Sequence, residues 1–144
     1  MDIDEPECWV LLDDHGVDRV AVVTDDGPVI HSFNYQVVGR EVLFMTAAGT
    51  PLAKAAGLGL TITFEQDHVG TAFSQGWSVL LVGPVRRVSD PATARSLSEL
   101  ACSTPWAGDG RDVLVVFAPN RVTGRRIRVE GAPGTEPGAG LDSR

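Results

Sequence analysis

The sequence has 144 residues, 43% of them hydrophobic, which is enough to bury the core of one domain. Asp and Glu number 19 against 12 Lys and Arg, and the net charge of -7 argues against nucleic-acid partners, because phosphate backbones bind basic residues. No apolar run has the length of a membrane span, and residues 1–5 are too acidic for a secretory signal. We therefore expect a cytoplasmic protein without a membrane partner.

The first part of the chain predicts one short helix followed by a meander of strands. Residues 5–12 have helical apolar spacing that directs Trp9 and Leu12 toward a sheet. The runs that follow are separated by glycine turns and predict strands at residues 20–24, 29–38 and 42–46. Such short connections favour an antiparallel sheet or barrel.

A second helix is predicted at residues 50–57, with Thr50 as N-cap, Pro51 at the first position and Gly57 as the stop. Strict alternation predicts the next strand at residues 60–65. Residues 67–75 then read as a loop, which places His68 in a polar turn, as the sequence also predicts for His15.

A long strand is predicted at residues 76–88, and Gly83 and Pro84 in its middle indicate a bend where a barrel closes. A third helix begins near Pro91 and ends by Pro105. The apolar run 113–118 is typical of a strand buried on both faces, and residues 121–129 predict the last strand.

Cys8 and Cys102 are far apart in the sequence, so we expect reduced, apolar thiols and no disulfide framework. No metal site is expected, because the His and Cys residues lack the short spacings of zinc ligands. Residues 131–144 contain a single large apolar residue, Leu141. We therefore expect one domain at residues 1–130 and a disordered tail at residues 131–144.

Several short strings, in order, resemble the pyridoxamine 5'-phosphate oxidase-like flavin-binding split-barrel family between residues 18 and 128. They lie at residues 19–31, 33–35, 43–50, 76–80 and 122–127. The resemblance implies a mainly β fold, a six-stranded antiparallel Greek-key split barrel that forms a homodimer with cofactor sites between the chains. It implies FMN or the deazaflavin coenzyme as cofactor, while some members bind haem or no flavin.

A phosphate of the cofactor is predicted to bind at the start of the second helix. Thr46 and Thr50 offer hydroxyls, the helix N-terminus offers its positive dipole end, and Lys54 follows one turn later. Pro51 departs from the family pattern, because relatives commonly carry Lys or Arg there and proline lacks an N–H group. The alternative is that this segment only starts the helix and Lys54 is solvated.

The ring of the cofactor is predicted to contact the second strand. The resemblance places the string from His31 through Ser32 and Phe33 to Asn34 against the isoalloxazine. The Asn34 amide both donates and accepts hydrogen bonds, which suits the pyrimidine edge of a flavin. His31 is also a candidate proton donor, although a histidine within the barrel packing is the simpler interpretation.

Further candidates come from the later strings and from isolated aromatic or basic residues. Trp77 and Ser78 match positions near the cofactor in relatives, and Trp106 is a candidate for stacking across the dimer. Arg125 and Arg126 are candidates for an acidic substrate or an anionic cofactor tail. The alternatives are core or interface packing for the tryptophans and solvent exposure for the arginines.

The first functional hypothesis is a flavin- or deazaflavin-dependent oxidoreductase that transfers a hydride to a small conjugated acceptor. The second is a non-catalytic carrier of flavin, haem or a lipid-like ligand. It is favoured by Pro51 and by Val82, which stands where many relatives have arginine. The third is a barrel that serves only as an interaction domain.

Overall fold

The computed structural model describes residues 2–13, 15–70, 75–101 and 113–128. Over these residues the helices are α1 (Glu5–Leu11), α2 (Pro51–Leu58) and α3 (Pro91–Ala101). The strands are β1 (Asp2–Ile3), β2 (His15–Thr24), β3 (Gly27–Val38), β4 (Glu41–Thr46), β5 (Thr61–Gly70), β6 (Gln75–Val88), β7 (Val113–Phe117) and β8 (Arg121–Arg128). Trp106, Cys102 and the predicted tail lie outside the described residues.

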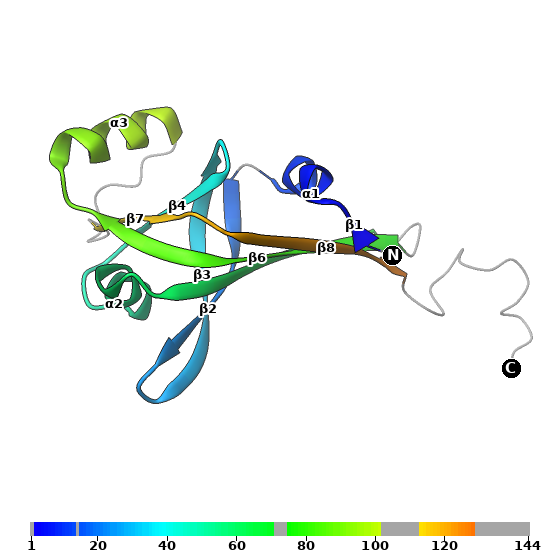
Figure 1. Ribbon diagram of the computed structural model, residues 1–144, viewed down its shortest axis with the longest axis horizontal. Coiled ribbons are helices and arrows are strands. Elements are labelled where there is room, and N and C mark those ends of the chain that lie inside the picture. Colours follow the sequence, from blue (N-terminus) through cyan, green and yellow to red (C-terminus); the bar gives the residue numbers. More distant parts are fainter. Residues whose placement is uncertain (1, 14, 71–74, 102–112, 129–144) are drawn as a thin grey trace, which may run out of the picture.

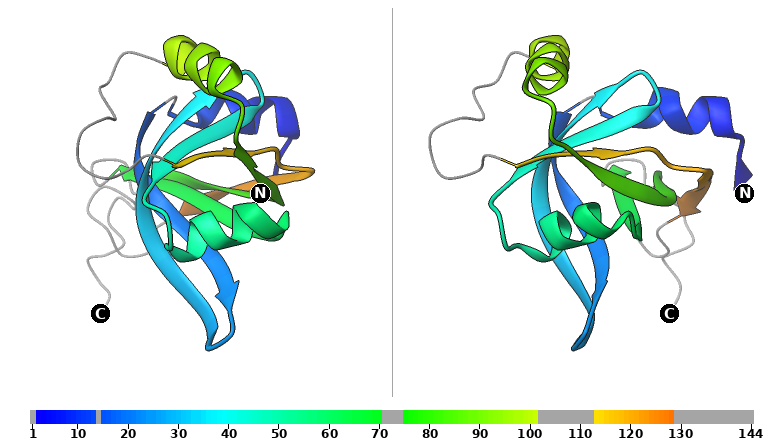
Figure 2. Two further views of the ribbon diagram at one scale, coloured as in Figure 1. Left: turned by 90° about the vertical axis from the view of Figure 1, so that its left-hand side faces the viewer. Right: turned by 60° about the vertical axis from the view of Figure 1, so that its left-hand side comes forward.

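Six strands close an antiparallel barrel. Their order is β6-β5-β2-β3-β4-β7, and β7 pairs back with β6. β8 and β1 continue the sheet from the other half of β6, so the barrel wall extends sideways beyond the point of closure (Figures 1 and 2). This arrangement confirms the predicted mainly β, six-stranded split barrel.

β6 changes partner at Gly83, which confirms the predicted bend. Up to Val82 it pairs with β8, and from Val85 onward it pairs with β7. A Cβ atom on Gly83 would lie 2.6 Å from the Cα of Pro119 and 2.8 Å from the N of Asn120. Glycine is therefore required, because the chain returning from β7 to β8 passes directly over this backbone.

Aromatic side chains fill the barrel. Tyr35, Phe44, Phe64 and Phe117 are fully or nearly fully buried, and the Tyr35 and Phe64 rings meet edge to face at 5.0 Å. All of β7 is buried, as predicted, because a second apolar cluster covers its outer side. That cluster joins Leu43, Leu114 and Val116 to Met45, Val38, Val88, Ala94 and Leu97, the last two from α3.

α2 packs across one end of the barrel and buries Leu52 and the alanines of its inner face. Thr50 is its N-cap and Pro51 its first residue, as predicted. The prediction that Gly57 stops the helix is wrong. Gly57 lies within the last turn, and Gly59, with a φ of 67°, is the left-handed residue that ends it.

The predicted loop at residues 67–75 is also wrong over its first part. β5 continues to Gly70 and pairs with β6 along its whole length, so His68 lies in a strand opposite Trp77. His15 likewise begins β2 and is not in a turn. Polar residues on strand faces hid both extensions, because composition alone favoured a loop there. Among the described residues, no helix is long and apolar enough to cross a membrane.

Gly83→Ala is expected to destabilise the fold by about 3 kcal/mol or more, because the new methyl group meets backbone atoms that cannot move aside. Gly57→Ala is the matched control. A Cβ atom at Gly57 meets nothing within 4 Å, and alanine in a helix is favoured over glycine by about 0.5–1 kcal/mol. Urea unfolding of both variants tests the contrast; equal effects of the two changes would contradict it.

Gly124→Ala is expected to push α1 away from β8, because its Cβ atom would lie 2.6 Å from the Cys8 sulfur. We expect a loss of about 2 kcal/mol from overpacking. The double variant with Cys8→Ala removes the clashing sulfur and should recover part of that loss. A double-mutant cycle by chemical unfolding measures the coupling, and strictly additive effects would show that the two sites are independent.

Candidate functional site

Alternation along β3 separates the predicted ring contacts into two sides. Phe33 points inward and packs on Phe44 at 6.1 Å, and His31 shares this side with its ring 6.2 Å from Phe33. Ser32 and Asn34 are exposed on the opposite side, outside the barrel. Residues 31–34 therefore supply two outward polar groups, Ser32 and Asn34, while Phe33 belongs to the core packing.

Pairing across the sheet extends this outward side into one surface, which we call the outer face. It joins side chains of β2, β3, β5 and β6: Val17, Arg19, Ile30, Ser32, Asn34, Glu65, Asp67, Ser78 and Leu80. Val17 is 59% exposed and Ile30 67%, so apolar groups stand in solvent beside Asn34 and Ser32. Exposed apolar side chains that gather on one face beside polar groups are a feature of binding surfaces.

A charged network crosses the middle of the outer face. The Arg19 guanidinium donates to Glu65 Oε1 at 2.7 Å and to Asp67 Oδ2 at 3.0 Å. Ser78 Oγ donates to Glu65 Oε2 at 3.2 Å. The hydrogen bond and charge of Glu65 raise the pKa of Arg19. Because two carboxylates already balance this cation, the centre of the face does not attract anions.

Ser78 and Arg125 come together at the edge of the outer face. They are direct partners across β6 and β8, and both line a shallow pocket of about 420 Å³ that also contains Asp2. Trp77 and Arg126 lie on the other side of these strands. Trp77 stacks on His68 at 6.1 Å, and Arg126 forms an ion pair with Glu7 of α1.

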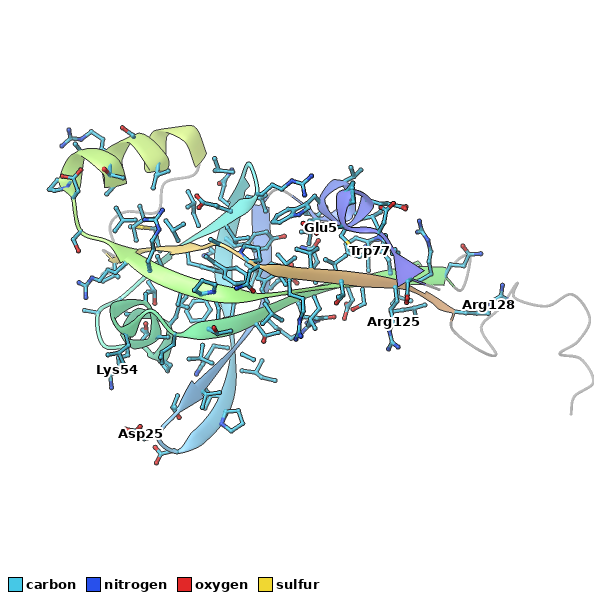
Figure 3. The ribbon with its side chains drawn as sticks, in the orientation of Figure 1. Glu5, Asp25, Lys54, Trp77, Arg125 and Arg128 are labelled. Atoms are coloured by element: carbon cyan, nitrogen blue, oxygen red, sulfur yellow. The ribbon has the colours of Figure 1, made fainter. Side chains whose placement is uncertain are left out.

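Figure 3 shows this division, with Trp77 on the side of α1 and Arg125 on the side of β8 away from it. Trp77 is also partly buried and packs against the core of the barrel in its own chain. The predicted residues of β6 and β8 thus serve two surfaces.

The hydroxyls at the start of α2 are engaged within the protein. Thr46 is 2% exposed, and its Oγ1 lies 2.8 Å from Thr50 Oγ1. Thr50 Oγ1 donates to the carbonyl of Ala47 at 3.0 Å and accepts from the N–H of Ala53 at 3.2 Å. Thr46 therefore donates to Thr50, and both hydroxyls hold the helix start in place.

Lys54 and Pro51 line a pocket between α2 and the tip of the β2–β3 hairpin. Its volume of about 430 Å³ lies within the range of small-molecule sites. Lys54 is exposed on one wall, and Asp25 lies in the hairpin turn on the other (Figure 3). Among the described residues, Lys54 forms no ion pair.

A family model described as pyridoxamine 5'-phosphate oxidase matches residues 4–126. The chain belongs to the pyridoxamine 5'-phosphate oxidase-like family. The resemblance inferred from the short strings is therefore confirmed. Within the described residues, His, Cys, Asp and Glu side chains form no group of three or more that would hold a metal ion.

Two relatives are similar to the chain over most of its length. The uncharacterized protein Rv0080 of Mycobacterium tuberculosis is 31% identical over 133 residues, which cover 88% of this chain and 85% of that protein. The FAD binding protein from Mycobacterium smegmatis is 34% identical, with a TM-score of 0.70, and the match covers 88% of this chain and 98% of that one.

A more distant structure shares the fold alone. The FAD and heme binding protein from Mycobacterium smegmatis is 19% identical, with a TM-score of 0.65, and the match covers 92% of this chain and 75% of that one. That protein and the present chain thus have the same fold.

A buried polar cluster inside the barrel was missed by the sequence analysis. The Gln66 side-chain N–H group donates to Asp18 and to the Tyr35 hydroxyl, and its Oε1 accepts from the N–H of Asp13 at 3.0 Å. The signal was present, because Gln66 continues the inward alternation of Ile62 and Phe64. It was overlooked because the predicted strand ended at Glu65, five residues before the end of β5.

Burial, reinforced by the negative charge of Asp18, raises the pKa of Tyr35 well above its ordinary value of 10.0. Between pH 10.0 and the raised pKa of the folded state, the folded chain therefore keeps the Tyr35 hydroxyl proton, whereas the unfolded chain releases it. The contribution of Tyr35 to the free energy of unfolding is complete below the ordinary pKa and is lost as the pH rises through the folded-state pKa.

Tyr35 is the only tyrosine of the sequence, so its titration is directly visible. We expect tyrosinate absorbance to appear only together with alkaline unfolding, and stability to fall with pH above the ordinary pKa. Tyr35→Phe should remove that part of the pH dependence. Tyrosinate formation at ordinary pKa in the intact fold would contradict the burial argument.

Proposed function

We propose that two copies of the chain bind a flavin between their outer faces and that the complex is an oxidoreductase. The bound flavin would transfer a hydride to a small conjugated acceptor. The observation that carries the proposal is the outer face itself, where exposed apolar side chains surround exposed hydrogen-bonding groups. The 34% identical FAD binding protein supports it, because the match spans nearly all of that chain.

The outer face suits one side of a flat heteroaromatic ring. Ile30 and Val17 offer apolar contact, and Asn34 and Ser32 stand between them with exposed polar groups. Among the described residues, neither polar side chain has a hydrogen-bond partner. The Asn34 amide therefore has both its donor and its acceptor available for a ring edge that alternates N–H and C=O.

The second wall of the site would come from another copy. A single outer face is open to solvent, so it neither encloses a ring nor excludes water. Two identical faces related by a two-fold axis would cover each other's exposed Val17, Ile30 and Leu80 and leave two equivalent grooves. The predicted homodimer thus removes apolar surface from water at the same time as it forms the sites.

The chain's own residues would act by positioning. When bound, the flavin supplies the hydride chemistry, and the protein's task is to hold ring and acceptor in register away from water. Asn34 and Ser32 would fix the ring edge, and Arg125 beside Ser78 would bind an acidic acceptor. His31 lies on the other side of β3, so no role is assigned to it.

A second candidate function is flavin binding without turnover, as in a carrier. It is favoured by the start of α2, where Pro51 has no N–H group and the Thr46 and Thr50 hydroxyls are already engaged. Stoichiometric oxidation of a reduced flavin by a defined acceptor, repeated over many turnovers, supports the oxidoreductase. Tight flavin binding without such turnover supports the carrier.

Titration with FAD, FMN and the deazaflavin coenzyme, followed by fluorescence, is expected to show binding of at least one of them. Asn34→Ala should weaken it about tenfold, the effect of losing one or two hydrogen bonds at a ring edge. Asn120→Ala, an exposed amide in the β7–β8 turn, is the matched control and should leave affinity unchanged. Equal effects of the two variants would place the ring elsewhere.

Ile30→Asp is expected to abolish the dimer and flavin binding together, because it places a charge at the centre of the apolar contact. Sedimentation of the full chain measures the oligomeric state, and circular dichroism checks that the barrel is retained. A wild-type chain that stays monomeric at all concentrations, or a monomeric variant that binds flavin normally, would exclude the shared groove.

A further inference from the structure

We propose that the pocket between α2 and the β2–β3 hairpin tip binds the adenosine nucleotide end of FAD and so makes the protein prefer FAD to FMN. The inference rests on the flavin binding proposed above, but it concerns a different part of the molecule. The outer face would hold the ring, and the hairpin pocket would recognise what FAD has and FMN lacks.

The pocket has two apolar walls that face one another. On the hairpin, Val23 is 67% exposed; on the other side, Leu58 at the end of α2 is 74% exposed and Leu60 is 41% exposed. All three line the same pocket, together with Pro51. A slot between exposed apolar side chains from two separate elements suits a flat, weakly hydrated group such as a purine base.

Charged groups at the pocket match the remaining parts of a nucleotide. Asp25 and Asp26, in the hairpin turn, offer acceptors to ribose hydroxyls and to the exocyclic amine of adenine, as a carboxylate does in other dinucleotide sites. Lys54, on the opposite wall, offers a cation to the phosphate. Because two carboxylates and one cation line the pocket, it disfavours an isolated phosphate. A nucleotide suits it better, since its hydroxyl and amine groups can bind the carboxylates while its phosphate binds Lys54.

The geometry of the hairpin links the pocket to the ring site. β2 pairs with β5 only from Arg19 to Ala21, so the hairpin diverges from the barrel beyond that point and the pocket opens in the space it leaves. Val23 in the pocket wall lies on the same side of β2 as Arg19, the outer-face partner of Ser32, and the two residues are four apart on one extended strand, about 14 Å. An extended FAD bridges such a span, while FMN ends at its single phosphate.

The test compares FAD and FMN affinities of the full chain by fluorescence titration. The wild type should bind FAD at least about tenfold more tightly, which corresponds to one charge-assisted contact. Lys54→Ala and Asp25→Asn should each reduce FAD affinity about tenfold and leave FMN affinity unchanged. Lys54→Arg keeps the cation and should retain the preference, and Arg86→Ala, an exposed cation outside the pocket, is the control.

A second readout uses ADP alone. Lys54 is the only lysine of the sequence, so acetylation followed by peptide mass spectrometry reports on this pocket. ADP should protect Lys54 from acetylation and should displace FAD but not FMN. Every variant changes an exposed side chain, and circular dichroism verifies that each one folds.

The outcomes separate the two proposals. If no flavin binds, both the proposed function and the pocket assignment are overturned. If FAD and FMN bind equally, or if Lys54→Ala weakens both by the same factor, only the pocket assignment is overturned and flavin binding stands. A retained preference for FAD in Lys54→Ala and Asp25→Asn, with no protection of Lys54 by ADP, likewise overturns the pocket assignment.

Discussion

β6 pairs with different strands along its two halves, and the rest of the architecture follows from this. Its second half closes the barrel against β7, while its first half carries β8 and β1 as an extension of the wall. The change of partner occurs at Gly83, where the backbone near Pro119 comes too close for any side chain. Because of this change of partner, β8 lies beside β6 outside the closed barrel, and its Arg125 reaches the edge of the outer face.

The same pleated wall decides which residues can act together. Side chains of neighbouring residues point to opposite sides of a strand, so each short string that resembles the family is divided between core and outer face. Ser78 faces outward beside Arg125, whereas Trp77 stacks on His68 and Arg126 pairs with Glu7. The outer face is thus assembled from alternate residues of several strands rather than from any continuous motif.

Most elements were predictable because their signals are local. The capped start of α2 at Thr50, the glycine turns and the buried run of β7 each depend on residues close in sequence. The extension of β5 beyond Glu65 was not predictable from composition, since Gln66 and His68 are polar. Gln66 is buried there only because Tyr35 and Asp18 supply its hydrogen bonds from strands that are distant in the chain.

The sequence by itself determined the class of fold and the order of its elements, because alternation, turn residues and helix caps act over a few residues. Only the tertiary structure decided which candidates are available to a ligand. The hydroxyls of Thr46 and Thr50 are hydrogen-bonded to each other and to the backbone, while Lys54 remains exposed at a pocket with Asp25. The reason is physical: whether a polar group is free depends on hydrogen-bond partners that folding brings into contact, and local sequence does not specify them.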